Sequence, residues 1–296
     1  MQGIIKAICL TGVACVIAGA ASIASAASPD GMKLYVFTSG RLTLDKSIIQ
    51  NGSSGKVQIP VGFFLIKHPK GNVLFDTGNN DRIITDPDYW GPLAKGLDPE
   101  RTPDVAIDTQ LGKIGVKTDD VKFVVVGHFH ADHAGNVGKF GNSTIVYQRD
   151  DLTNAFWPKP GFATFYITGD FQGLRAGVAA PMPNKQPVIE LAGDLDLFGD
   201  GSLFIHRSVS HTPGSQILVV RLPKTGTVVL TSDAIYLKEN LEKNILPSIG
   251  SVYSPNGMLD AYAWVRRMQD TENADVIFAH DPDTFKAHKH APEFYE

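Results

Sequence analysis

The apolar and polar positions along the chain predict many short strands separated by turns. Apolar runs of strand length cover residues 33–38, 61–67, 72–76, 121–126, 202–205, 216–222, 227–230 and 275–278. Such runs, bounded by Gly and Pro, are typical of strands that are buried in a sheet. The turns at residues 69–71 and 224–226 each join two neighbouring runs. Both pairs of runs are therefore predicted to form hairpins.

Helical spacing appears in two places. Thr102 followed by Pro103 is typical of a helix start, because Thr caps the first turn and Pro fits the first helical position. Ile107, Leu111 and Ile114 then recur at helical spacing. Further on, one helix face is predicted from Met258, Tyr262, Val265 and Met268.

Residues 157–187 are rich in Gly and Pro and lack a clear period, which predicts a long loop region. Its aromatic residues are consistent with two arrangements: they could line a substrate groove, or they could pack the loop onto the body of the protein. These residues are Phe162, Phe165, Tyr166 and Phe171.

The order of these elements predicts a single α/β domain, because strands and helices alternate without a linker between them. The chain has 296 residues and a formal net charge of -4, with 43% hydrophobic and 20% charged residues. These values exclude a disordered or fibrous protein. The mild negative charge gives no reason to expect nucleic acid or an anionic membrane as a partner.

The first 26 residues resemble a secretory signal peptide. Lys6 precedes an apolar run over residues 7–20, and residues 24–26 read Ala-Ser-Ala, a small-x-small cleavage site. A membrane anchor is one alternative, but the run is short for a spanning helix. A lipoprotein signal around Cys15 is another, but Gly12 stands where such a signal would have Leu. Residues 27–296 are then predicted to form a periplasmic or secreted domain without stable membrane insertion. Both cysteines, Cys9 and Cys15, would leave with the signal peptide, so any metal must be held by His, Asp or Glu.

A dense group of potential metal ligands follows the predicted strand 121–126. His128, His130, Asp132 and His133 lie within six positions in the sequence Gly-His-Phe-His-Ala-Asp-His. His128 and His130 can face one way on an extended backbone, and Asp132 and His133 can turn to a second point. Imidazole and carboxylate together suit zinc or a similar divalent ion, so the segment predicts a metal site.

Four ligands from one loop do not complete two metal sites, so further ligands must come from elsewhere. His211, Asp233 and His280 each follow an apolar run directly, as the first group does. This shared position at strand ends favours a common site. The remaining histidines, which are His68, His206, His288 and His290, lack such neighbours and are expected to be solvated surface groups.

The ordered set His-x-His-x-Asp-His, His, Asp, His resembles that of the metallo-β-lactamase superfamily. The resemblance implies a four-layer αβ/βα sandwich that binds two divalent ions, with zinc expected. One ion would be held by His128, His130 and His211, and the other by Asp132, His133 and His280. Asp233 would bridge the two ions. Asp76, in Leu-Phe-Asp-Thr-Gly, matches an Asp that orients a ligand His.

Within that superfamily the chain is most similar to the N-acyl homoserine lactonases. The similar segments are Lys-Leu-Tyr at 33–35, Gly-Arg at 40–41, Leu-Asp-x-Ser at 44–47, Asp-Ala-Ile-Tyr at 233–236, Lys-Glu-Asn at 238–240 and Pro-Glu-Phe-Tyr at 292–295. They extend over nearly the whole of residues 27–296. The resemblance adds Tyr236 as an active-site residue.

These features predict an exported hydrolase that opens the lactone ring of N-acyl homoserine lactones and so interferes with quorum signals. A hydroxide shared by the two metal ions would attack the carbonyl carbon. Tyr236 would donate a hydrogen bond to the carbonyl oxygen, and Asp132 would carry a proton to the leaving alkoxide. The alternative is another esterase or an organophosphate hydrolase of the same superfamily. The sequence leaves the oligomeric state open, a dimer included.

Overall fold

The computed structural model describes residues 28–160, 165–175 and 186–296. The predicted signal peptide at 1–26 and Phe162 lie outside the described residues. Within the described ranges, no helix is both long enough and apolar enough to cross a membrane.

Two sheets form the body of the protein. The first sheet has the order β1 (Lys33–Asp45), β2 (Lys56–Lys67), β3 (Asn72–Phe75), β4 (Val121–Val125), β5 (Thr144–Gln148), β6 (Val188–Leu191). The second has the order β11 (Asp275–Ile277), β10 (Gly226–Leu230), β9 (Ser215–Leu222), β8 (Leu203–Ser208), β7 (Leu195–Asp196). The β2–β3 and β9–β10 pairs are antiparallel, so both predicted hairpins are confirmed.

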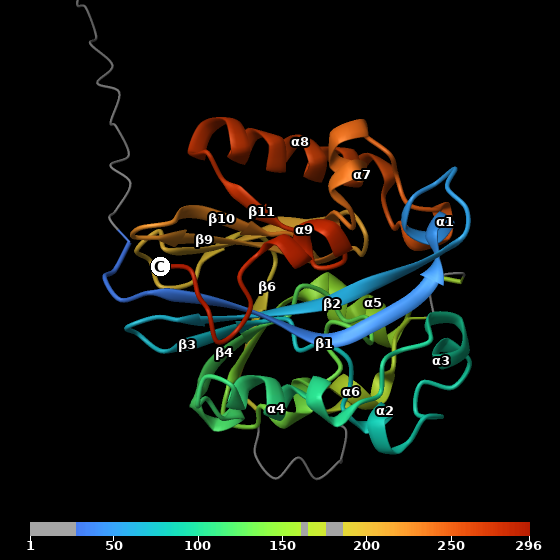
Figure 1. Cartoon of the computed structure of the whole chain (residues 1–296), viewed down its shortest axis with the longest axis horizontal. Helices are drawn as coiled ribbons and strands as arrows, with labels where there is room; N and C mark the ends of the chain where they lie inside the picture. Colours follow the sequence, from blue (N-terminus) through green and yellow to red (C-terminus); the bar gives the residue numbers. More distant parts are fainter. Residues whose placement is uncertain (1–27, 161–164, 176–185) are drawn as a thin grey trace, which may run out of the picture.

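Helices cover the outer face of each sheet, as Figure 1 shows. On the first sheet these include α4 (Ile107–Gly112), α5 (Arg149–Phe156) and α6 (Thr168–Phe171). On the second sheet the long helix is α8 (Pro255–Glu272), which buries the predicted face of Met258, Tyr262, Val265 and Met268. The four-layer αβ/βα sandwich and the single domain that the sequence predicted are therefore confirmed.

The core explains why the strands read as continuous apolar runs. Along β9, Leu218 and Val220 point between the two sheets, while Ile217 and Val219 pack against α8. Strands buried on both faces keep apolar side chains at successive positions rather than at alternate ones.

The β1–β2 pair extends beyond the rest of its sheet as an arm that ends at α1 (Lys46–Ile49). The register shifts between Thr38 and Arg41, where Gly40 has a φ of +99°. Gly adopts this backbone conformation without a steric penalty, so β1 can bend at this point. Beyond the bend, Leu42, Leu44 and Ile59 turn apolar side chains toward one end of the sandwich.

The predicted helix start at Pro103 is only partly correct. Residues Pro103–Val105 form a single 3-10 turn, and Ala106 is not helical. The α-helix begins at Ile107, whose backbone N–H donates to the Asp81 carboxylate at 3.1 Å. The cap therefore comes from a residue that is distant in sequence, and Thr102 makes no side-chain capping bond.

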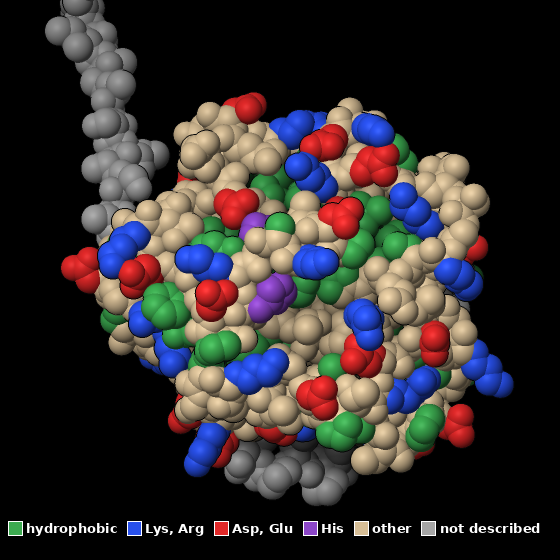
Figure 2. Space-filling model, in the orientation of Figure 1, with side chains coloured by type: hydrophobic (Ala, Val, Ile, Leu, Met, Phe, Trp, Pro, Cys, Tyr) green, Lys and Arg blue, Asp and Glu red, His purple; other side chains and the backbone are tan. Residues whose placement is uncertain are grey.

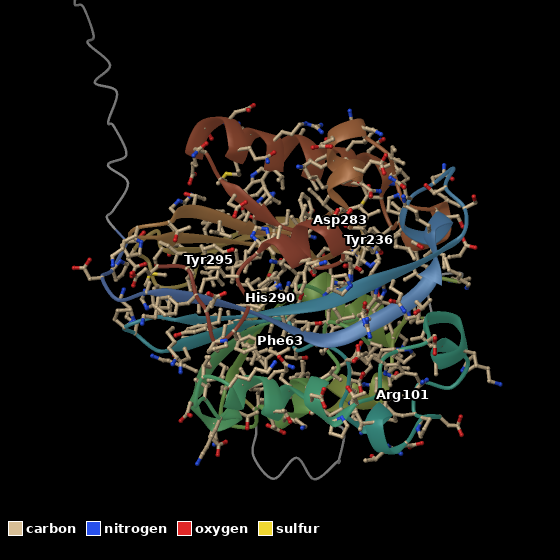
Figure 3. The ribbon with its side chains drawn as sticks, viewed as in Figure 1. Phe63, Arg101, Tyr236, Asp283, His290 and Tyr295 are labelled. Atoms are coloured by element: carbon tan, nitrogen blue, oxygen red, sulfur yellow. The ribbon has the colours of Figure 1, made fainter. Side chains whose placement is uncertain are left out.

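The remaining helices are short. They are α2 (Arg82–Thr85), α3 (Pro92–Leu97), α7 (Lys238–Lys243) and α9 (Pro282–Ala287). The chain returns to the first sheet at its end, where Tyr295 and Leu34 exchange backbone hydrogen bonds of 2.9 and 3.0 Å (Figure 3). On the face shown in Figure 2, acidic and basic side chains are interspersed.

Candidate metal centre

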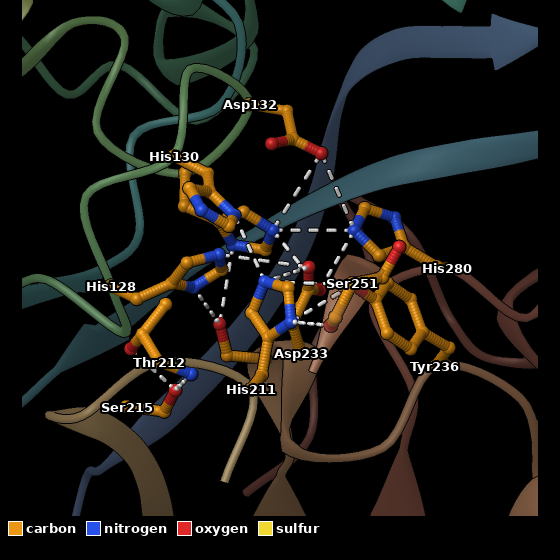
Figure 4. A network of polar contacts seen from close by, with 12 residues as sticks. His128, His130, Asp132, His211, Thr212, Ser215, Asp233, Tyr236, Ser251 and His280 are labelled. Carbon is orange, nitrogen blue, oxygen red and sulfur yellow. Dashed lines mark hydrogen bonds and ion pairs between the residues drawn. The ribbon is translucent and has the colours of Figure 1, made fainter. Parts of the chain in front are cut away.

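All seven predicted ligands lie together at one end of the sandwich, and Figure 4 labels each of them except His133. The loop after β4 carries four of them, His128, His130, Asp132 and His133, and the other three follow strands of the second sheet. β10 and β11 are parallel, so Asp233 and His280 leave the sheet at the same edge. The centre is therefore built where strand ends of both sheets meet, the usual position of sites in α/β folds.

The first cluster consists of His128, His130, His211 and Asp233, all of them buried. Nε2 of His211 lies 2.9 Å from Nδ1 of His130. Oδ2 of Asp233 lies 3.6 Å from Nε2 of His128 and 3.4 Å from Nε2 of His211. These distances leave the four ligand atoms around one common point.

The second cluster consists of Asp132, His133 and His280. The Nε2 atoms of His133 and His280 lie 3.2 Å apart. Oδ2 of Asp132 lies 3.7 Å from Nε2 of His133 and 3.5 Å from Nε2 of His280. Oδ1 of Asp233 also reaches this cluster, at 3.1 and 2.9 Å from the same two nitrogens. Asp233 thus presents one carboxylate oxygen to each cluster.

The outward ring nitrogens show which atoms remain for a ligand. Nδ1 of His133 lies 2.8 Å from Oδ2 of Asp76, and Nδ1 of His280 lies 2.7 Å from the carbonyl oxygen of Pro60. Nδ1 of His211 lies 2.8 Å from the carbonyl oxygen of Ser251. Those oxygens only accept hydrogen bonds, so each Nδ1 carries a hydrogen and each Nε2 faces inward as the ring nitrogen that a cation can reach.

The electrostatics of the first cluster favour neutral imidazoles. Burial lowers the pKa of His128 and His130 well below the usual value, and neighbouring imidazoles lower it further. Burial also lowers the pKa of His211. Burial alone would raise the pKa of Asp233, but His133 and His280 outweigh it and hold that pKa well below its usual range. Neutral imidazole and ionised carboxylate are the forms that bind metal.

The second cluster attracts positive charge. Burial disfavours the imidazolium of His133, yet the carboxylates of Asp233, Asp132 and Asp76 raise its pKa well above the usual value. A cation that binds here has to displace that proton. In addition, Nε2 of His128 is buried without a hydrogen-bond partner. Converging ring nitrogens, a shared carboxylate and an unpartnered buried nitrogen fit divalent cations well.

Gly135 fixes the ligand loop against the segment that follows β3. Its N–H donates to the carbonyl oxygen of Gly78 at 3.0 Å, and a Cβ at this position would overlap the backbone of Gly78, Asn79 and Asn80. Backbone atoms cannot rotate away as a side chain can, so this close approach requires Gly.

We expect Gly135→Ala to destabilise the metal-free protein by about 1–3 kcal/mol, the range for an overpacked site. Gly112→Ala is the matched control, because it lies at the end of α4 and its added Cβ would meet open space. That control should stabilise slightly or leave stability unchanged. Urea midpoints measured for both variants test this, and a wild-type midpoint for Gly135→Ala would contradict it.

A cavity that is open to solvent on one side lies beside the two clusters. Its apolar wall comes from the β1–β2 arm, α1 and α3, and its lining also includes Asp132, Tyr236 and Phe165. The apolar wall residues are Leu42, Leu44, Ile48, Ile49, Ile59 and Leu97. Tyr236 is buried, and its hydroxyl oxygen lies 3.1 Å from Nδ1 of His211.

Of the aromatic residues in the predicted loop region, one lines the cavity and another packs into the core. Phe165 lines the cavity, and it also lines a smaller hollow together with Tyr166. Phe171 is buried in the core beneath the first sheet. The region is not wholly a loop, because it includes α6 and a 3-10 turn at Gln172–Leu174.

The expectation that the other histidines are solvated is wrong for His68. Its side chain is buried, its ring stacks on Phe198 at 4.1 Å, and its Nδ1 accepts from the N–H of Lys70 at 3.0 Å. Nε2 of His68 lies 3.2 Å from the hydroxyl of Ser202, so this imidazole joins the β2–β3 turn to the second sheet. His206, His288 and His290 are half-buried and have partners as well.

Three residues of the site escaped sequence reasoning. Pro60 and Ser251 act through backbone carbonyl oxygens, which carry no sequence signal. Ser232 lies next to Asp233, and its hydroxyl contacts Asp76, 3.0 Å away. A Ser in this position reads as an ordinary residue at a strand end.

Comparison with known proteins relates these features to characterised chains. The family model described as "Metallo-beta-lactamase superfamily" matches residues 60–280. The chain is 34% identical over 268 residues to N-acyl homoserine lactonase AttM of Azorhizobium caulinodans, covering 90% of this chain and 99% of that protein. It is likewise 34% identical over 269 residues to AttM of Agrobacterium fabrum, covering 89% and 98%.

A solved structure resembles the whole sandwich. It is an N-acyl homoserine lactone hydrolase with the product N-hexanoyl-L-homoserine bound at its catalytic metal centre. The superposition has a TM-score of 0.75 at 25% sequence identity and covers 89% of this chain and 98% of that chain.

Proposed function

This chain belongs to the metallo-β-lactamase superfamily, and we propose that it is an exported, dinuclear-metal lactonase that opens the ring of N-acyl homoserine lactones. The observation that carries the proposal is the pair of His/Asp clusters that share Asp233 beside an apolar cavity. The two relatives that are named N-acyl homoserine lactonases align with 90% and 89% of this chain. Export rests on the layout of residues 1–26.

The donor set of the clusters is five imidazoles and two carboxylates without a thiolate, which suits zinc. We propose one divalent ion in each cluster, with Asp233 as the shared ligand. Two such ions, when bound, lower the pKa of water toward neutrality and polarise an ester carbonyl.

Two side chains at the cavity have roles in the proposed reaction. Burial, together with the carboxylates of Asp233 and Asp132, raises the pKa of Tyr236 well above its usual value. The phenol therefore stays protonated and can donate a hydrogen bond to the lactone carbonyl oxygen as negative charge develops there. Asp132 is more exposed than Asp233, and in Figure 4 only one of its oxygens has dashed lines to the histidines. The other oxygen would carry a proton to the alkoxide that leaves.

The cavity wall indicates where the acyl chain of the substrate would lie. The six aliphatic residues and the polar clusters line the same cavity. An ester group at the metal centre would therefore place an attached acyl chain along the β1–β2 arm. Burial of each methylene there contributes about 0.8 kcal/mol.

We expect Ile48→Ala to lower kcat/KM for a long-chain lactone about tenfold, because pocket contacts of this size are worth roughly 1–3 kcal/mol. The value for a butanoyl lactone should change little. Ile84→Ala is the matched control, since Ile84 packs on the same apolar cluster but does not line the cavity. Equal losses on short and long chains would place the acyl group elsewhere.

The function is tested with the purified residues 27–296. Elemental analysis gives the metal content, and mass spectrometry of protein secreted with its leader shows whether cleavage follows Ala26. Acyl homoserine lactones and a paraoxon-type phosphotriester are then assayed side by side. Two equivalents of metal and a preference for the lactones are expected. A preference for the phosphotriester would overturn the lactonase assignment and favour the organophosphate hydrolase alternative.

A further inference from the structure

Ser232 occupies a backbone conformation that Ser rarely adopts. Its φ is +44°, in the left-handed region, and it lies in the 3-10 turn Ser232–Ala234 that carries Asp233. Residues other than Gly are strained in this region, and such strain often persists where function requires the side chain. Gly would fit this backbone better, so the hydroxyl of Ser232 needs an explanation.

The hydroxyl of Ser232 lies among three buried polar groups, which are Asp76 and one ligand histidine from each cluster. It is 3.0 Å from Oδ2 of Asp76, 3.2 Å from Nδ1 of His133 and 3.4 Å from Nδ1 of His128. All four side chains are fully buried. Gly127 makes this approach possible, because a Cβ there would overlap the Ser232 hydroxyl.

The donor and acceptor capacities of these groups allow one consistent arrangement. The carboxylate of Asp76 only accepts, so the Ser232 hydroxyl donates its single hydrogen to Oδ2. The same Oδ2 accepts from Nδ1 of His133 at 2.8 Å. A lone pair of the hydroxyl is then free to accept from Nδ1 of His128, which directs Nε2 of His128 into the first cluster as a lone pair.

We propose that Ser232 is a positioning residue that extends the influence of Asp76 from the second cluster to the first. Asp76 orients His133 directly and orients His128 through the Ser232 hydroxyl. One buried carboxylate thereby sets the tautomer of a ligand in each cluster. This inference rests on the proposed dinuclear site.

The test compares Ser232→Ala and Ser232→Gly by metal binding, with chelator competition as the measurement. Both variants remove the hydroxyl, but only the Gly variant relieves the backbone strain. Both should weaken one of the two metal equivalents about 10–100-fold, the usual loss when a partner of a ligand His is removed. The metal-free Gly variant should melt at or above the temperature of the Ala variant.

Asn273→Gly is the matched control, because Asn273 is an exposed residue with a φ of +49° at the end of α8. It should bind metal as the wild-type protein does. If Ser232 served only the backbone, Ser232→Gly would bind metal like the wild type, and that result would overturn the proposal. A wild-type protein that takes up no divalent metal would instead overturn the proposed function.

Discussion

Asp233→Asn is expected to lower kcat/KM for lactone hydrolysis about a thousandfold. Each carboxylate oxygen of Asp233 faces one cluster. In the Asn variant an NH₂ group takes the place of one oxygen, and its hydrogens would face the metal-binding position of that cluster. The shared ligand is then lost from one of the two sites. Metal-ion stabilisation of developing charge is worth several kcal/mol, and about 4 kcal/mol corresponds to a factor of about a thousand.

The measurement is steady-state kinetics combined with elemental analysis of the same preparation. Asp170→Asn is the matched control, since Asp170 is also buried but lies in α6, where it accepts from Tyr89 and Asn80. Burial raises the pKa of Asp170 to about 7, so the neutral amide is a close substitute for its carboxyl group. Asp233→Asn with both full metal content and full activity would contradict the bridging role.

Tyr236→Phe is expected to lower kcat about a hundredfold and to leave KM nearly unchanged. A hydrogen bond to the developing oxyanion strengthens as charge builds up, so its loss acts on the chemical step more than on binding. The ring itself stays in place, because it stacks on His280 with centroids 5.8 Å apart. Metal content should therefore match the wild type.

The pH dependence of the wild-type enzyme provides a further check on Tyr236. Burial and the nearby carboxylates of Asp233 and Asp132 raise its pKa well above the ordinary value of a tyrosine, so the phenol remains a donor throughout the neutral and mildly alkaline range. Loss of activity between pH 7 and 9 would then have to come from another group and would persist in Tyr236→Phe. Unchanged turnover in that variant would remove Tyr236 from the mechanism.

The candidate site could be predicted largely from sequence because its ligands are rare residue types in one repeated context. His128, His211 and His280 each follow an apolar run, and strand ends on one edge of a sandwich meet in space. The two-sided burial of strands such as β9 similarly produced continuous apolar runs that were easy to recognise.

Other features depend on contacts that the sequence does not encode locally. The predicted runs missed β5, β6 and β7, each of which is defined by pairing with a neighbouring strand. The helix after Thr102 begins late because Asp81, distant in sequence, supplies its cap. His68 was misjudged because its burial depends on Phe198 and Ser202, which lie in the turn between β7 and β8.

The predicted ligands follow strands of both sheets, so a bound ion would hold the two sheets together. Cys9 and Cys15 lie before residue 28, so the described part contains no thiol and no disulfide can join its two sheets. An ion shared by His130 and His211, or by His133 and His280, would connect segments that are far apart in sequence. Such an ion would act as a reversible cross-link in place of a covalent one, and it would restrict the unfolded chain as a disulfide does.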